Sequence, residues 1–164
     1  MTSGGRLTIR SARPGEAGLV LGFVQELAEY EKLTQEAVAT EIQIDAALFG
    51  ETPRIFCDIA EWEGEPVGFA LWFLNFSTFN GRSGIYLEDL FVRPAHRGKG
   101  IGKALMVHLA RKCVENGWAR LQWSVLDWNT PSIEFYKSLG GVLLDEWTVV
   151  RVSGDALTRL AKAT

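Results

Sequence analysis

The segment Arg97-Gly98-Lys99-Gly100-Ile101-Gly102 has the residue types of an anion-binding loop. Its three glycines at alternate positions let the backbone approach a ligand and direct consecutive N–H groups at it. A predicted helix follows, and its N-terminus adds a partial positive charge to the full charges of Arg97 and Lys99. We therefore expect a phosphate or pyrophosphate here, with a loop that serves only a tight turn as the alternative. The spacing is neither that of a Walker A loop nor that of the dinucleotide fingerprint.

Two neighbouring carboxylates precede this loop on a predicted strand. In a regular strand the side chains of Glu88 and Asp89 point to opposite faces, so only one of them can face a bound ligand. A carboxylate there can accept a proton, or it can pair with an arginine as a structural group. Tyr136 lies on a short predicted helix, where its phenol is either a proton donor or part of a packed aromatic ring.

Hydrophobic periodicity predicts the elements that position these residues. We expect strands at residues 7–10, 54–62, 67–76, 85–92, 121–126, 142–144 and 147–152. We expect helices from Pro14 to about residue 31, from a cap at Thr34 to about residue 50, after the loop at 98–100 up to Gly117, and from a cap at Thr130 to residues 140–141. This order predicts an α/β or α+β fold, a mixed sheet with helices on its faces.

Composition indicates an ordinary globular protein. The chain has 164 residues, 47 % of them hydrophobic and 23 % charged, so we expect one domain over residues 1–164, with residues 1–5 flexible. Cys57 and Cys113 are expected to be buried thiols in a reducing compartment. No signal peptide is recognised, and the longest uncharged run, residues 66–81, is too short to span a bilayer. A soluble, cytoplasmic protein without membrane association is predicted.

Charge is distributed unevenly along the chain. The net charge of −3 disfavours nucleic acid as a partner. Residues 26–51 hold seven acids and one base, whereas residues 93–112 hold six bases and no acid. This division suits a cationic and an anionic ligand on one domain, and two solvated helix faces are the alternative. His96 and His108 have no Cys or Asp at ligand spacing, so no metal site is expected.

Residues 86–94 (Tyr-Leu-Glu-Asp-Leu-Phe-Val-Arg-Pro) and the loop at 97–102 together resemble the acetyl-CoA motif of the GNAT N-acetyltransferase superfamily. The resemblance implies the GNAT fold, a central, mostly antiparallel sheet with helices on both faces. In that fold the strand before the loop splays from its neighbour and pairs with the pantetheine arm, and loop amides bind the pyrophosphate. The implied acetyl-CoA-binding residues are Leu90, Phe91, Val92, Arg97, Gly98, Lys99, Gly100, Ile101, Gly102, Lys103, Asn129, Thr130, Pro131 and Ser132.

Residues 26–33, 125–129 and 135–137 resemble one branch of this superfamily, the diamine (spermidine/spermine) and thialysine N-acetyltransferases. This resemblance, over about residues 6–152, implies that Glu88 accepts the amine's proton directly or through water and that Tyr136 protonates the leaving thiolate. It implies that a backbone N–H near Leu90 polarises the acetyl carbonyl, and it leaves Asp89 with structural contacts. The implied substrate-binding residues are Tyr30, Glu31, Glu88, Gln122, Trp123 and Ser124.

Two positions distinguish the subgroups of this branch. Ser77 and Phe79 stand where the polyamine enzymes have an acid and a tryptophan, and the thialysine enzymes share the serine. The sequence therefore leans toward the thialysine enzymes, because fewer acids weaken binding of a long polycation. Trp147 is expected to pack over the site or in the core, and Asp145 or Glu146 to supply an acid near it.

The expected function is acetyl transfer from acetyl-CoA to a primary amine by direct attack in a ternary complex. The amine would belong to a thialysine-like or lysine-like amino acid, a diamine or a polyamine. The alternatives are a non-catalytic sensor or scaffold that binds acetyl-CoA and a lysine N-acetyltransferase that acts on proteins or peptides. The resemblance also implies a homodimer that shares its C-terminal strands across the interface.

Overall fold

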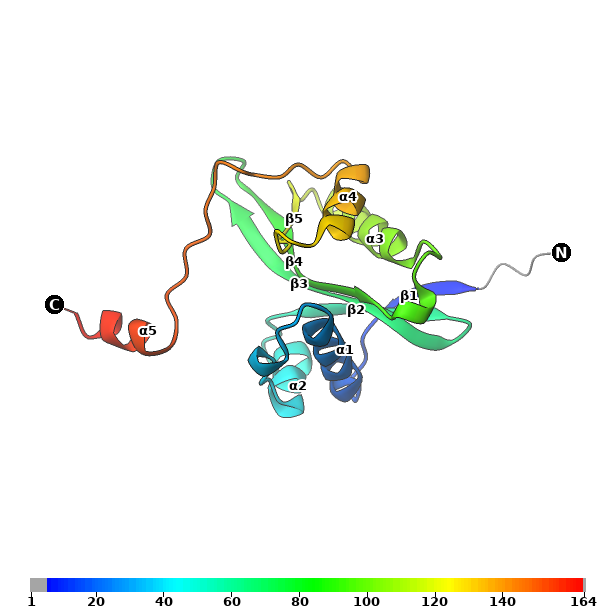
Figure 1. Cartoon of the computed structure of the whole chain (residues 1–164), viewed down its shortest axis with the longest axis horizontal. Coiled ribbons are helices and arrows are strands. Elements are labelled where there is room, and N and C mark those ends of the chain that lie inside the picture. The colour runs from blue at the N-terminus through cyan, green and yellow to red at the C-terminus, as the bar shows by residue number, and fades with distance from the viewer. Residues whose placement is uncertain (1–5, 164) are drawn as a thin grey trace. The chain divides into compact units, whose positions relative to one another are not determined.

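A computed structural model describes residues 6–163 of the chain, so the expected flexibility of residues 1–5 falls outside the described part (Figure 1). The chain divides into two compact units, with the boundary between Ser124 and Val125. The first unit contains β1 (Leu7–Ser11), α1 (Ala17–Tyr30), η1 (Thr34–Glu36), α2 (Glu41–Phe49), β2 (Phe56–Trp62), β3 (Glu65–Ser77), β4 (Arg82–Val92), η2 (Pro94–His96), α3 (Ile101–Glu115) and β5 (Leu121–Trp123). The second contains α4 (Thr130–Ser138) and α5 (Gly154–Ala161). That the whole chain is one domain stays a prediction.

The first unit is built on a five-stranded sheet with the order β1-β2-β3-β4-β5. The first four strands pair antiparallel, and β5 runs parallel to β4. Figure 1 shows α1 and α2 on one side of this sheet and α3 on the other. The expected mixed, mostly antiparallel sheet with helices on both faces is confirmed.

Strand β4 departs from regular pairing at the point where the carboxylates lie. Leu71 of β3 pairs with Asp89 whereas Trp72 pairs with Leu87, so a bulge leaves Glu88 without a partner on β3. On its other side, β4 pairs with β5 only over Ile85–Leu87 within the described chain. From residue 88 to its end, β4 therefore has an open edge, as the expected splay requires.

The core of the first unit lies between α1 and the sheet. Val20, Phe23 and Leu27 recur at helical spacing and are buried against strand residues that include Phe69 and Phe91. The rings of Phe23 and Phe69 stack with centroids 5.2 Å apart. Each such buried side chain contributes about 1.5–3 kcal/mol. This packing holds the C-terminal end of α1 beside β4.

Three predicted helix starts were wrong: α1 begins without a side-chain cap bond, whereas side-chain caps fix the starts of α2 and α4. The first helix starts at Ala17 rather than near Pro14. The second starts at Glu41, after a capping box in which Thr40 Oγ1 accepts from the Gln43 N–H and Gln43 Oε1 accepts from the Thr40 N–H, and the expected cap Thr34 only opens η1. Asn129, not Thr130, caps α4 by accepting a hydrogen bond from the Ser132 N–H.

The last two predicted strands, residues 142–144 and 147–152, are not strands in the described chain. Their apolar side chains are largely exposed, with Val142 and Val149 both 81 % exposed and Trp147 75 % exposed. An alternating pattern becomes a strand only when another strand supplies hydrogen-bond partners, and no described segment pairs with these residues. Periodicity also missed α5, which follows directly.

Candidate active site

The glycine-rich loop between η2 and α3 has the conformation that an anion site needs. Gly98 and Gly100 adopt positive φ angles of 79° and 77°, which favour glycine over any residue with a Cβ. The i→i−4 hydrogen bonds of α3 begin with that from the Ala104 N–H to the Gly100 carbonyl, at 3.0 Å. The N–H groups of Ile101 and the next two residues, Gly102 and Lys103, therefore have no partner within the helix. These donors fit the pyrophosphate of acetyl-CoA.

The basic side chains of the loop are exposed and lie against aromatic rings. Lys99 Nζ lies 4.8 Å from the centre of the Trp62 ring and 3.3 Å from His96 Nδ1. Arg97 Nε donates to the Val92 carbonyl at 2.9 Å, and its guanidinium carbon lies 4.8 Å from the centre of the Tyr30 ring. The loop thus contacts both the end of β4 and the end of α1.

The last residues of β4, which follow the bulge, form the open edge that was predicted to meet the pantetheine arm. Phe91 is buried in the core, and Leu90 and Val92 are half-buried. Because the side chain of Phe91 packs in the core, only its backbone groups can contact a ligand. A backbone edge of this kind can pair with the amides of an extended ligand as another strand would.

Three carboxyl groups, Glu88 and Asp89 on β4 and Glu31 after α1, are linked electrostatically. Glu88 is exposed at the bulge, and Asp89 is half-buried. Burial, with smaller contributions from the charges of Glu88 and Glu31, raises the pKa of Asp89 to about 7. Burial also raises the pKa of Glu31, the residue that ends α1. Neighbouring carboxylates in such a setting favour a bound cation, for instance a protonated amine.

The position of Asp89 was not foreseen from the sequence. Strict alternation assigned Glu88 and Asp89 to opposite faces, but the bulge interrupts that alternation between them. Asp89 feels the charges of Glu31 and Glu88, so it belongs electrostatically to the same group. The sequence shows two adjacent acids on a strand. Only the register of β4 against β3 shows that a bulge separates their pairing.

The predicted substrate residues of β5 lie beside the same stretch of β4. Gln122 pairs with Tyr86, and Trp123 pairs with Leu87, the residue before Glu88. The hydroxyl of Tyr86 lies 3.0 Å from Ser124 Oγ. Tyr30 is the last residue of α1, and Glu31 follows it. All the predicted amine-binding residues therefore lie in the first unit.

The remaining predicted residues lie in the second unit. Asn129 is buried, and its side chain accepts a hydrogen bond from the Ser132 N–H at 3.3 Å, with Thr130 and Pro131 in the first turn of α4. Tyr136 is half-buried on α4, and its ring centroid lies 5.4 Å from that of Phe135. The helix predicted to carry Tyr136 is confirmed, and the roles of these residues stay predictions.

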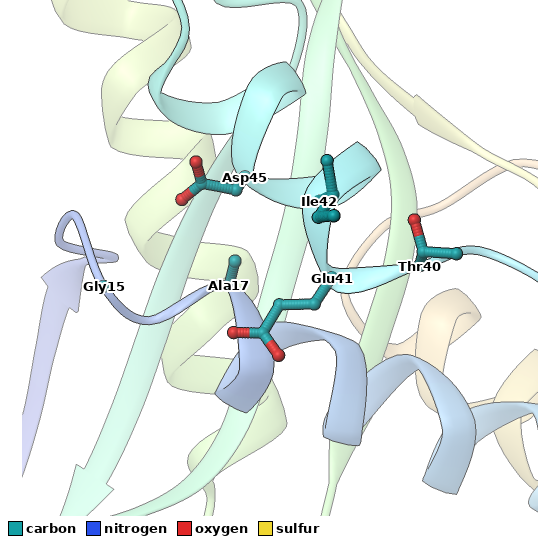
Figure 2. Close-up of a pocket in the computed structure, with 6 residues that line it drawn as sticks. All are labelled: Gly15, Ala17, Thr40, Glu41, Ile42 and Asp45. Atoms are coloured by element: carbon teal, nitrogen blue, oxygen red, sulfur yellow. The ribbon is translucent and has the colours of Figure 1, made fainter.

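The other candidate features of the described residues lie apart from these positions. A pocket of about 480 Å³ is lined by residues of the α1 start and of α2, and Figure 2 shows Glu41 extending across it toward Ala17. It contains none of the predicted site residues. Among residues 6–163, no cluster of three or more His, Cys, Asp or Glu side chains could hold a metal ion. No helix in the same range combines the length and apolarity needed to cross a membrane.

Ser77 and Phe79, the two positions that distinguish the subgroups of the branch, also have defined surroundings. Ser77 is buried, and its hydroxyl accepts a hydrogen bond from the Asn80 N–H at 3.2 Å in the β3–β4 turn. Phe79 is fully exposed at that turn. The serine therefore has a structural task in this unit, and Phe79 is available to a ligand or partner.

Comparison with known proteins identifies the family. Residues 22–140 match the family described as Acetyltransferase (GNAT) family. The chain is 40 % identical to the thialysine N-epsilon-acetyltransferase of Bos taurus, over 93 % of this chain and 96 % of that protein. It is 29 % identical to an L-ornithine N5-acetyltransferase of Arabidopsis thaliana, over 94 % of this chain and 87 % of that protein.

Solved structures agree on the fold. An integron cassette protein of V. cholerae matches with a TM-score of 0.80 and 30 % identity, over 96 % of this chain and 98 % of that chain. An aminoglycoside N-acetyltransferase in complex with CoA matches with a TM-score of 0.73 and 20 % identity, over 93 % and 98 % of the two chains. GNAT enzymes take their acetyl group from acetyl-CoA, which suits the loop at residues 97–102. The chain therefore belongs to the GNAT family and is an acetyl-CoA-dependent acetyltransferase.

Proposed function

We propose that this enzyme transfers the acetyl group of acetyl-CoA to a side-chain amine of a small amino acid of the thialysine, lysine or ornithine type, with diamines as weaker substrates. The observation that carries the proposal is the group of carboxyls around the β4 bulge, Glu88, Asp89 and Glu31, beside an open strand edge. Carboxylates attract a protonated amine, and the edge can hold an extended acyl donor. The relatives named as thialysine and ornithine acetyltransferases support the same class of substrate.

The proposed reaction is a direct attack in a ternary complex. A side-chain amine has a pKa of about 10 and must lose a proton before it can attack. Glu88 accepts this proton, directly or through a water molecule, and the backbone N–H of Leu90 donates a hydrogen bond to the acetyl oxygen as negative charge develops there. Tyr136 then donates a proton to the departing sulfur of CoA. The chain's own groups thus account for each proton that moves.

Two sets of residues are proposed to bind acetyl-CoA. In the first unit the amides of the loop at residues 98–103 hold the pyrophosphate, and the edge of Leu90, Phe91 and Val92 holds the pantetheine arm. The resemblance to the GNAT family implies Asn129, Thr130, Pro131 and Ser132 as further acetyl-CoA-binding residues. The positively charged Arg97 and Lys99 favour the anionic ligand near the loop.

We also propose that the enzyme is a cytoplasmic homodimer. The exposed apolar side chains of residues 142–152, which no described strand covers, support a second copy as the missing partner. The free and buried Cys57 and Cys113 fit a reducing compartment. Light scattering during gel filtration tests the dimer: a monomer at micromolar concentration contradicts it.

A panel of amines tests the substrate class. We would measure initial rates of CoA release with thialysine, lysine, ornithine, putrescine, spermidine, spermine and a lysine-containing peptide. The proposal predicts the highest kcat/KM for amino acids with a side-chain amine. A clear preference for spermidine or for the peptide would contradict the proposed substrate and favour the polyamine or the peptide acetyltransferase.

A further inference from the structure

Arg97 makes three contacts that join the cofactor loop to the amine-binding side of the first unit. Its Nε donates a hydrogen bond to the carbonyl of Val92, the last residue of β4, at 2.9 Å. Its guanidinium carbon lies 4.8 Å from the centre of the Tyr30 ring and 5.4 Å from that of the Phe91 ring. One side chain from the loop therefore touches the end of β4 and the end of α1.

The geometry suits an arginine in particular. A guanidinium is planar and weakly hydrated, so it can stack on an aromatic ring while its N–H groups make hydrogen bonds in their own plane. A lysine supplies a point charge without that plane. Among residues 6–163, Arg97 forms no ion pair with a carboxylate. Its stack on Tyr30 is therefore not the by-product of a neighbouring salt bridge.

Arg93 provides the contrast within the same region. Its guanidinium carbon also lies 4.8 Å from an aromatic ring, that of Phe23, but Phe23 is fully buried and Arg93 pairs with Glu26 at 3.2 Å. Arg93 therefore links the end of β4 to α1 through Glu26 and the buried ring of Phe23. Arg97 contacts a ring that is 36 % exposed, at the position where α1 ends and Glu31 follows.

We propose that Arg97 is a positioning residue for the amine: its stack on Tyr30 holds the end of α1, with Tyr30 and Glu31, in the conformation that receives the substrate. This inference rests on the proposed function, which assigns Tyr30 and Glu31 to amine binding. Since Arg97 also belongs to the loop assigned to pyrophosphate, acetyl-CoA and amine each affect the affinity of the other through this contact. A residue that acted only on the cofactor would leave the affinity for the amine unchanged.

A double-mutant cycle separates the two roles. We would combine Arg97→Gln with Tyr30→Leu, measure KM for the amine and kcat at saturating acetyl-CoA, and measure the Kd of acetyl-CoA by calorimetry without amine. The cycle isolates the energy of the pair from the independent effect of each residue. An exposed cation–π contact corresponds to about a two- to fivefold change in an equilibrium constant. Arg97→Gln should therefore raise the KM for the amine by about this factor, in addition to any change in the Kd of acetyl-CoA. In the Tyr30→Leu background this additional factor should disappear.

Two matched variants keep the outcome interpretable. Tyr30→Phe retains the aromatic face, so Arg97→Gln should keep its effect on the KM for the amine in that background. Arg93→Gln removes an arginine that stacks on a different ring, and its effect should be additive with that of Tyr30→Leu. Thermal unfolding of every variant identifies any that fail to fold.

The results discriminate between the inference and the proposed function. Additive effects of Arg97→Gln and Tyr30→Leu on the KM for the amine, in an enzyme whose wild type acetylates the amine, would overturn the positioning role. Coupling that affects only the Kd of acetyl-CoA would overturn it as well. A wild-type enzyme that binds acetyl-CoA but acetylates no amine would instead contradict the proposed function.

Discussion

Asp89 lies beside Glu88 at a bulge in β4, where Glu88 loses its partner on β3 and Asp89 resumes the pairing opposite Leu71. The bulge brings an exposed carboxylate and a half-buried one to the start of the open edge of β4. Bulges often occur next to active sites because they re-aim side chains without ending the strand. The bulge thus interrupts the alternation that would point two consecutive acids to opposite faces, as the proposed joint action of Glu88 and Asp89 on one amine requires.

The first prediction concerns the stability contributed by Asp89. Its pKa is about 7 in the folded enzyme, against about 3.9 for an ordinary aspartate in the unfolded chain. The unfolded chain therefore loses this proton first, and the free energy of unfolding falls as the pH rises from about 4 to 7. Asp89→Asn should remove that fall and raise the stability above pH 7 by about 1–3 kcal/mol relative to the wild type. Urea unfolding at pH 5 and pH 8 measures the difference, and an equal effect of the variant at both pH values would contradict the assignment.

The same carboxyls should govern the pH dependence of catalysis. If the amine needs both negative charges, kcat/KM of the wild type should rise with pH through about 7, where Asp89 ionises. Asp89→Asn should abolish this rise and leave kcat/KM low, because asparagine cannot supply the second charge, whereas Glu88→Gln should require a higher pH because the amine must then lose its proton to solvent. Rate profiles from pH 5.5 to 9.5, a range of about four units around the expected transition, give the comparison. Identical pH profiles for the wild type, Asp89→Asn and Glu88→Gln would show that neither carboxyl governs the pH dependence of catalysis.

A further prediction tests the glycine loop through its backbone. Gly98 has a φ of 79° and open space around its missing Cβ, so Gly98→Ala introduces conformational strain without a clash. The loop should change conformation, and the Kd for acetyl-CoA should rise about tenfold, corresponding to about 1.4 kcal/mol. Gly64→Ala is the matched control, because Gly64 has a φ of 87°, equally open space and a place in the β2–β3 turn. Calorimetry should show nearly wild-type binding for the control, and equal weakening in both variants would argue against a role for the loop.

Tyr136 is predicted to act in the chemical step. Tyr136→Phe should lower kcat by about a hundredfold or more, because a general acid typically contributes that much, while the Kd of acetyl-CoA stays nearly constant. The ring is retained, so its contact with Phe135 at 5.4 Å is preserved. Steady-state kinetics and equilibrium binding on the same preparations separate the two effects. Turnover equal to that of the wild type would exclude Tyr136 as the acid.

A last prediction concerns a buried carboxyl that the mechanism does not use. Asp58 is 2 % exposed, and its Oδ2 accepts a hydrogen bond from the Trp72 indole at 2.8 Å, while its Oδ1 lies 3.2 Å from His108 Nε2. Trp72→Phe should lower the free energy of unfolding by about 1–3 kcal/mol because the carboxyl loses its donor. The loss should be smaller in an Asp58→Asn background. Urea unfolding checks this, and equal losses in the two backgrounds would show that ring packing alone matters.

The sequence predicted most of the first unit because its patterns are local. Apolar residues at helical spacing on α1 and α3 and the runs of β2 to β4 are read without knowledge of the fold. The turn at Glu63 and Gly64, both with positive φ, joins β2 to β3 between two runs that were predicted as strands. The glycine loop before α3 was recognisable because glycine alone tolerates its backbone conformation.

The features that sequence reasoning missed depend on contacts between distant residues. The bulge at Glu88 arises from the register of β3 against β4, and no property of residues 88 and 89 alone reveals it. The stack of Arg97 on Tyr30 joins residues that are far apart along the chain. Residues 142–152 alternate like strands but lack partner strands in the described chain. Each of these results from tertiary pairing, which overrides local propensity.

The proposed enzyme acetylates the side-chain amine of a small amino acid. The most direct test is mass spectrometry of the products after incubation of the wild-type enzyme with acetyl-CoA and thialysine. The expected product is thialysine that carries one acetyl group on its side-chain nitrogen, formed in equal amount to the CoA released. Tight binding of acetyl-CoA without acetylated thialysine, lysine or ornithine would contradict it and favour a sensor of acetyl-CoA.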